Sequence, residues 1–298
     1  MNKLQTYFLA FLLLMTLAVI GWGLDALQIR DSAERSLVKT NVSNRVLQDS
    51  ASDIARTNTG ITFADFPRTL IKTGVIDIKR YRAITPLSSA QETLLSSDTR
   101  TTPIYTGEDD QFTLNLLWGL GLAQENKYLG ELATLQQEER LGVLASTGGW
   151  AISAGDATVH FSKHNILNLS DEQQRRVADI AATIYRSCCN NHARFADCNH
   201  GMAMLGVLSL GVAQGLSDDA LYTLALQFNR VWFPDTYEQI AQYFARIEGR
   251  NWKDVNPQEI LDARFSSASG FSQNVARPLA ALKTQEPAAG SKSGSCSL

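Results

Sequence analysis

The chain has 298 residues, of which 44% are hydrophobic and 19% are charged, and its formal net charge is −3. This composition is that of an ordinary folded protein, and it gives no global electrostatic basis for binding nucleic acid. Four cysteines are too few for a small scaffold held together by disulfides. The length allows one large domain or two small ones.

The first 27 residues determine where we expect the protein to lie. The run from Tyr7 to Gly23 carries no charge, and as a helix it would be about 26 Å long, close to the thickness of a bilayer core. Lys3 supplies the positive flank of a signal sequence. No Ala-x-Ala cleavage site follows, so residues 1–27 are interpreted as an uncleaved signal anchor in preference to a cleaved signal. We expect a single-pass attachment to the cell membrane, or secretion after cleavage, with the rest of the chain outside the cytoplasm.

Helical signals dominate the first half of the remaining chain. Residues 28–60 are polar, with apolar positions spaced as in a helix, and predict a helical stalk or linker that ends near 57. Short helices are predicted around 67–72, between a turn at Gly74 and Ile84, and from about 85 to 95. A stronger pattern covers 111–135, interrupted near 126–130. The segment from 141 to 156 is rich in glycine and serine and predicts a buried loop, in which Gly148 and Gly149 let the backbone pass close to a neighbour, or an ordinary connection between helices.

The second half continues the helical pattern. Ser170 and Gln173 form a capping box, which predicts a helix from Asp171 to about Ser187 that presents Cys188 and Cys189 at its end. A polar loop follows, and then a helix over 201–214 that is apolar on all sides and therefore buried. Further helices are predicted over 218–232, 236–247 and 257–265.

No segment shows the two-residue alternation of a strand. The sequence therefore predicts an all-α fold, an irregular or orthogonal multi-helix domain over 61–285, behind the N-terminal membrane helix. The low-complexity residues 286–298 predict a disordered tail.

The segment 188–204 holds three cysteines, two histidines and two methionines, and all four histidines of the chain lie between 160 and 200. Thiolate, imidazole and thioether groups are ligands for copper, zinc and iron. Copper(I) matches the whole inventory best, zinc is close behind, and iron is less favoured. The predicted metal ligands are Cys188, Cys189, His192, Cys198, His200, His160, His164 and Met202.

Neighbouring residues have expected roles in this cluster. His160 and His164 would share one face of a helix, because they are four positions apart. The positive N-terminus of the buried helix would stabilise a thiolate at Cys198. Asp197 is a candidate ligand or acceptor for an imidazole N–H, and Arg194 is expected to pair with it rather than bind an anionic substrate.

Two other interpretations stay open. Outside the cytoplasm, Cys188 or Cys189 can form a disulfide with Cys198, closing a loop of about ten residues and contributing roughly 2–3 kcal/mol. Alternatively, a Cys–His pair or a metal with an open position can catalyse a reaction. The sequence therefore predicts a membrane-anchored protein that binds a transition metal outside the cytoplasm. The alternatives are a metal- or thiol-dependent enzyme and a disulfide-stapled, non-catalytic envelope protein; no motif specifies a protein partner.

Overall fold

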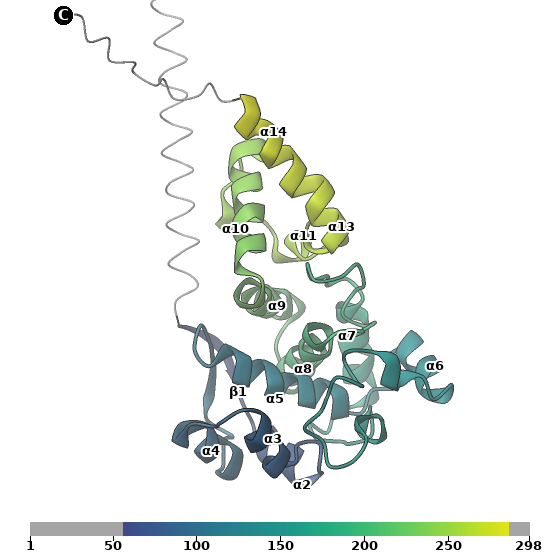
Figure 1. The fold of residues 1–298 in the computed structure, drawn as a ribbon. Helices are drawn as coiled ribbons and strands as arrows, with labels where there is room; N and C mark the ends of the chain where they lie inside the picture. The colour runs from purple at the N-terminus through teal and green to yellow at the C-terminus, as the bar shows by residue number, and fades with distance from the viewer. Residues whose placement is uncertain (1–55, 286–298) are drawn as a thin grey trace, which may run out of the picture.

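The computed structural model describes residues 56–285, which fold mainly into helices (Figure 1). The all-α class predicted from the sequence is confirmed in this main feature. The predicted membrane helix, most of the predicted stalk and the C-terminal tail lie outside the described residues. Between residues 56 and 285, no helix is long and apolar enough to cross a membrane.

The elements of the first half surround one long helix. In chain order they are β1 Thr57–Thr62, α2 Phe66–Lys72, α3 Ile78–Ile84, α4 Ser89–Ser96, β2 Pro103–Thr106, α5 Asp110–Ala123, α6 Glu131–Gln137 and two 3-10 turns, Leu141–Val143 and Ala157–His160. The three short predicted helices and the break between α5 and α6 are thus confirmed.

The second half contains the other long helices and a series of short ones. They are α7 Asp171–Ala181, α8 Asn199–Ala213, α9 Asp218–Trp232, α10 Pro234–Tyr243, α11 Pro257–Ile260, α12 Ala263–Ser266, α13 Ala268–Phe271 and α14 Arg277–Gln285, with π-helical turns at Phe244–Glu248 and Ser272–Ala276. The capping box of α7 is confirmed, because the Ser170 and Gln173 side chains each bond the other residue's backbone N–H.

The two strands are a correction to the expectation of a chain without strands. β1 and β2 pair antiparallel, and the register is irregular between Asn58 and Thr62. Residues 57–60, expected at the end of the stalk, belong to β1. The side chain of Gln214, just after α8, bonds both the N–H and the C=O of Thr62. These two bonds attach the small sheet to the end of α8, a contact that no local pattern reveals.

The centre of the fold is the contact between α5 and α8. Gly121 of α5 lies against Met202 of α8, and Gly206 of α8 lies against Leu117 of α5, so the helices run antiparallel. A Cβ atom at Gly121 would be 1.8 Å from the Met202 oxygen, and one at Gly206 would be 2.2 Å from the Leu117 oxygen. Both helices are buried along most of their length, which explains why neither has a clear polar face.

The glycine-rich loop between Leu141 and Asp156 is only partly buried, which corrects the prediction of a buried loop, since Val143, Gly148 and Gly149 are exposed. Ser146 and Thr147 are fully buried. A Cβ atom at Gly148 would be 2.0 Å from the Gly142 oxygen, and one at Gly149 would be 2.3 Å from the Ala145 oxygen. The two glycines therefore let the loop fold back tightly on itself.

Two predicted helices end early or do not form. α7 ends at Ala181 instead of near Ser187, because the N–H of Tyr185 donates to the carbonyl of Leu261 rather than to the preceding turn. His160 ends a 3-10 turn, and the backbone at Ser162 is left-handed, with φ of 51°. His160 and His164 therefore lie on an irregular segment and not on a helix.

Shorter corrections concern the last helices. α10 begins at Pro234 instead of Thr236 and continues as a π-helical turn before Gly249. The helix predicted over 257–265 is split into α11 and α12, because Asp262 takes an extended conformation and caps the second helix.

The arrangement places the cysteine-containing loop near the middle of the molecule. In Figure 1, β1 and α2–α4 lie at one end, and α10 and α14 run beside each other at the other end. α8 lies between them and packs on α5, α7 and α9. The loop from α7 to α8, residues 182–198, carries the three described cysteines to the start of α8.

Candidate metal centre

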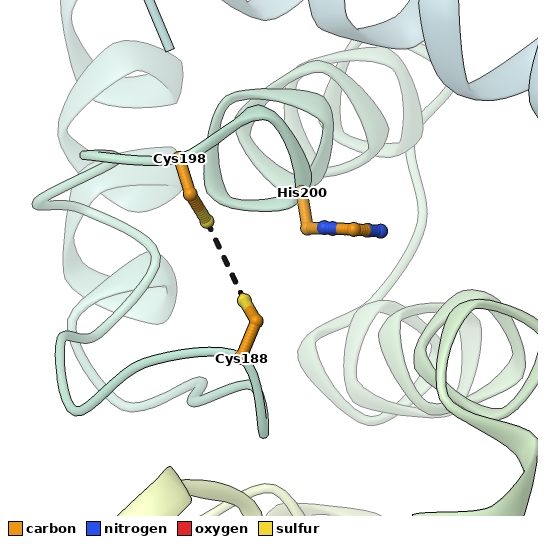
Figure 2. Close-up of side chains that lie close together, drawn as sticks. All are labelled: Cys188, Cys198 and His200. Carbon is orange, nitrogen blue, oxygen red and sulfur yellow. Dashed lines mark hydrogen bonds between the residues drawn. The ribbon is translucent and has the colours of Figure 1, made fainter. Parts of the chain in front are cut away.

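Three sulfur atoms gather at the N-terminus of α8. Cys198 is the N-cap residue of this helix, and its Sγ accepts the N–H of Gly201 at 3.4 Å. The Sγ of Cys188 lies 3.5 Å from that of Cys198 and 4.0 Å from that of Cys189. None of the three is in a disulfide. Figure 2 shows the sulfur atoms of Cys188 and Cys198 facing each other.

His200 lies beside this cluster on the first turn of α8, and Figure 2 shows its ring directed away from the two sulfur atoms. One ligand atom each from Cys188, Cys198 and His200 lies within 4.8 Å of the others, and Cys189, Asp197 and Cys198 form a second such set. The imidazole of His200 is packed against the rings of Trp232 and Phe233, at centroid distances of 5.6 and 4.7 Å. Cys198 belongs to both sets and is therefore the centre of the cluster.

A buried arginine lies beneath the sulfur atoms. The Arg186 side chain is fully buried, and its Nε donates to the Sγ of Cys198 at 3.3 Å. Its Nη2 donates to Asp197 Oδ1 at 2.9 Å and to the carbonyl of Phe195 at 3.4 Å, and its Nη1 donates to the carbonyl of Asn191 at 2.9 Å. A buried charge requires such partners, and the loop between the cysteines supplies them.

The partner of Asp197 corrects the sequence analysis. Asp197 pairs with Arg186 and not with Arg194, and its second oxygen accepts the side-chain N–H of Asn191 at 2.7 Å. The position depends on Gly201, because a Cβ atom there would lie 2.4 Å from Nη2 of Arg186. Sequence reasoning did not single out Arg186 or Gly201, since neither has a local signal that separates it from ordinary surface and core residues.

Hydrogen bonding shifts the pKa values of the three cysteines in different directions. The pKa of Cys198 is lowered strongly, because Cys188 and Cys189 donate hydrogen bonds to its sulfur and because His200 and Arg186 stabilise the thiolate. The same hydrogen bonds, to Cys189 and Cys198, raise the pKa of Cys188. The hydrogen bond from Cys188 lowers the pKa of Cys189. The hydrogen bond between Cys189 and Cys198 and burial act in the opposite direction, and together they raise the pKa of Cys189 overall. These shifts favour the thiolate form at Cys198 and the thiol form at Cys188 and Cys189.

Protein-family models, curated proteins and solved structures all give no match to this chain. The donor atoms of the cluster themselves indicate its chemistry. Sulfur and imidazole nitrogen suit soft or borderline ions such as Cu(I) and Zn(II), and a carboxylate can act as a further ligand.

His192 and Met202 are placed differently from the other predicted ligands. The Nδ1 of His192 accepts the N–H of Phe195 at 3.1 Å, and its ring lies edge-on to Tyr185. Met202 is fully buried, and its backbone faces α5. Two residues along a helix correspond to a rotation of about 200°, so Met202 projects away from the side of α8 that carries His200. Among residues 56–285, neither of the two sets includes His192.

His160 and His164 form a pair of their own. Their Nδ1 and Nε2 atoms are 3.0 Å apart, and the rings are stacked at 5.3 Å. The N–H of His164 donates to the carbonyl of Ala123 at the end of α5. The two imidazoles meet as predicted, although an irregular segment and not a helix brings them together. They belong to neither set around Cys198.

Proposed function

We propose that this protein binds one copper or zinc ion through Cys188, Cys198 and His200. The observation that carries the proposal is the convergence of two sulfur atoms and one imidazole within 4.8 Å at the start of α8. Softness of the donors favours these metals over magnesium or calcium, which take oxygen ligands.

Each residue of the set has a distinct role in the proposal. Cys198 supplies a thiolate that Arg186 and the N–H of Gly201 hold in place. His200 supplies an imidazole nitrogen, and its ring is packed against Trp232 and Phe233. Cys188 is exposed and completes the site from the solvent side. Cys189 and Asp197, which form the second set with Cys198, are the candidates for a fourth ligand.

The proposal includes the location of the protein. The uncharged run from Tyr7 to Gly23 supports attachment to the cell membrane, with the metal site outside the cytoplasm. A site of this kind would serve metal transport, storage or electron transfer.

Elemental analysis tests the proposal directly. The full chain is purified without oxygen or added metal, incubated with Cu(I) or Zn(II), and freed of excess ion. Bound metal and free thiols are then measured on the same sample. We expect one ion per chain, lost in Cys198→Ser and weakened at least about tenfold in His200→Asn, because each removes one ligand.

His192→Asn is the matched control, since it removes a nearby imidazole that lies outside both sets, and it should bind metal as the wild type does. A wild-type chain that binds neither ion would overturn the proposal. Intact thiols would then favour a thiol-dependent enzyme, whereas two missing thiols would favour a disulfide-stapled, non-catalytic protein.

A further inference from the structure

We infer that Cys188 and Cys198 form a thiol–disulfide exchange pair that oxidises to an intramolecular disulfide by reducing an external disulfide. Cys188 is the attacking cysteine and Cys198 the resolving cysteine. This activity goes beyond metal binding and requires no metal.

The distance between the two sulfur atoms supports the pair. They are 3.5 Å apart, and a disulfide bond is about 2.05 Å long, so the atoms need to approach by only about 1.5 Å. Both ends of the loop are anchored nearby. Cys198 caps α8, and the carbonyl of Cys189 accepts the N–H of Ala268 at 2.9 Å.

Exposure assigns the two roles. Cys188 is exposed, whereas Cys198 is partly buried and is covered on one side by the Arg186 guanidinium. An external disulfide can therefore reach Cys188 first. Cys198 lies behind it, in contact with the sulfur that would carry the mixed disulfide.

Cys189 is excluded from the pair by its surroundings. Its Sγ contacts Asp197 Oδ1 at 3.8 Å and the carbonyl of Asn191 at 3.9 Å. It lies 4.0 Å from Cys188 Sγ, farther than the 3.5 Å between Cys188 and Cys198. Neighbouring cysteines also form a disulfide only in a strained geometry. Cys189 therefore does not compete with Cys198 for Cys188.

The exchange proceeds in two balanced steps. The Cys188 thiol passes its proton to the Cys198 thiolate, whose sulfur lies 3.5 Å away, and attacks one sulfur of the external disulfide R–S–S–R. That S–S bond breaks, and the first thiolate leaves and takes up the proton from Cys198. The Cys198 thiolate then attacks Cys188 Sγ of the mixed disulfide, and the second thiolate leaves. The protein loses two electrons and one proton, and the external disulfide becomes one thiol and one thiolate, which takes up a proton from water.

The exchange and the proposed metal site exclude each other. Both sulfur atoms of the Cys188, Cys198 and His200 set are consumed by the disulfide. Oxidation by an external disulfide would therefore release a bound ion, and reduction would restore the site.

Oxidised glutathione serves as the probe of this activity. The experiment uses the full chain carrying Cys296→Ser, which leaves the three clustered cysteines, reduced and freed of metal by a chelator. After mixing, samples are quenched with acid, and disulfides are mapped by mass spectrometry. We expect one Cys188–Cys198 disulfide and two equivalents of reduced glutathione per chain.

Three variants separate the two steps. Cys198→Ser should accumulate glutathione on Cys188, with a mixed disulfide that lasts at least roughly tenfold longer, because the resolving sulfur is absent. Cys188→Ser should form no intramolecular disulfide, and Cys189→Ser should behave as the parent chain. Serine is itself a good N-cap, so Cys198→Ser keeps the start of α8, which a circular dichroism spectrum checks.

The inference is overturned if the disulfide maps to Cys189, if Cys198→Ser accumulates no mixed disulfide, or if the folded chain reacts no faster than the chain in urea. Metal is absent throughout this experiment, so its outcome is independent of metal binding. If the chain binds metal but does not exchange disulfides, the inference is rejected and the proposed metal-binding function stands. If the chain exchanges disulfides but binds no metal, the proposed metal-binding function is rejected and the inference of disulfide exchange stands.

Discussion

One arginine and one glycine determine the position of the central sulfur atom. Arg186 is fully buried and reaches Cys198, Asp197 and two backbone carbonyls at once. Gly201 leaves the space that the guanidinium occupies. The position of the Cys198 sulfur therefore depends on a residue twelve positions earlier in the chain, and the site tolerates little change at either position.

Gly201→Ala is expected to lower the free energy of unfolding by about 1–3 kcal/mol, the usual cost of overpacking. The new Cβ atom would lie 2.4 Å from Arg186 Nη2, and burial prevents the side chain from moving aside. This cost exceeds the gain in helix propensity, which is at most about 1 kcal/mol. Urea denaturation followed by circular dichroism measures the change.

Gly142→Ala is the control for this substitution. The nearest atom to a Cβ there is 3.7 Å away, so the change in stability should stay within about 0.5 kcal/mol. Equal stability of the Gly201→Ala variant and the wild type would contradict the role given to Gly201.

The pair of His160 and His164 predicts a pH dependence. The pKa of His164 is lowered by burial, then by His160 and Lys163. Above about pH 6.5, His164 is neutral in both states and contributes nothing. As the pH falls below that value, the unfolded chain binds a proton before the folded chain does, so the free energy of unfolding decreases. The lowered pKa of His192 acts in the same direction.

Urea denaturation between about pH 5 and pH 7 measures this effect. His164→Gln should make the decrease in stability with falling pH smaller. Lys163→Gln should reduce it by less, because burial is the main cause. An unchanged pH profile in His164→Gln would show that the histidine pair does not account for the dependence.

At the scale of elements, the contact between α5 and α8 holds the site in place. Gly121 and Gly206 allow the two backbones to touch, and α8 then carries Cys198 and His200 at its first turn. Elements with strong local signals, such as α7 with its capping box, were predicted well at their starts from the sequence. The end of α7 was not, because distant hydrogen bonds replace helical ones there.

Gly121→Ala and Gly206→Ala are each expected to destabilise the protein by about 3 kcal/mol, at the upper end of overpacking effects. The added methyl groups would meet backbone oxygens at 1.8 and 2.2 Å, which can move only if the helices separate. Thermal unfolding and the free-thiol reactivity of Cys198 report the loss of packing and of site geometry together.

Gly119→Ala provides the comparison within α5. Its Cβ atom would meet only side chains, Trp150 and Leu70, at 3.1–3.2 Å, and these can give way slightly. Gly119→Ala should therefore lower the free energy of unfolding clearly less than Gly121→Ala does. The same loss at both positions would argue against a special backbone contact at Gly121.

At the scale of the molecule, one hydrophobic core includes residues from β1 to α14. The loop that carries the cysteines is bonded to several parts of this fold. Asp197 accepts the N–H of Ser146 in the glycine-rich loop, and Tyr185 donates to Leu261 directly after α11. Cys189 accepts the N–H of Ala268 in α13. A ligand that binds the cluster is therefore expected to stabilise the whole fold.

Metal binding predicts a rise in the melting temperature. An ion present at a hundred times its dissociation constant stabilises the native state by about 2.7 kcal/mol, which corresponds to roughly 5–10 °C for a domain of this size. Thermal unfolding with and without Cu(I) or Zn(II) measures the shift. His192→Asn should keep it and Cys198→Ser should lose it; a shift that persists in Cys198→Ser would place the ion elsewhere.

The sequence by itself determined the helical class, most helix starts and the cluster of sulfur and imidazole groups. Helix starts depend on a few adjacent residues, as at Ser170 and Gln173, and ligand types are visible in composition. The fold alone decided which ligands converge. It placed His200 beside Cys198, turned Met202 toward α5, kept His160 and His164 outside both sets, and paired Asp197 with Arg186. The small sheet and the end of α7 were decided in the same way, because Gln214 and Leu261 supply hydrogen bonds from distant positions that no local pattern encodes.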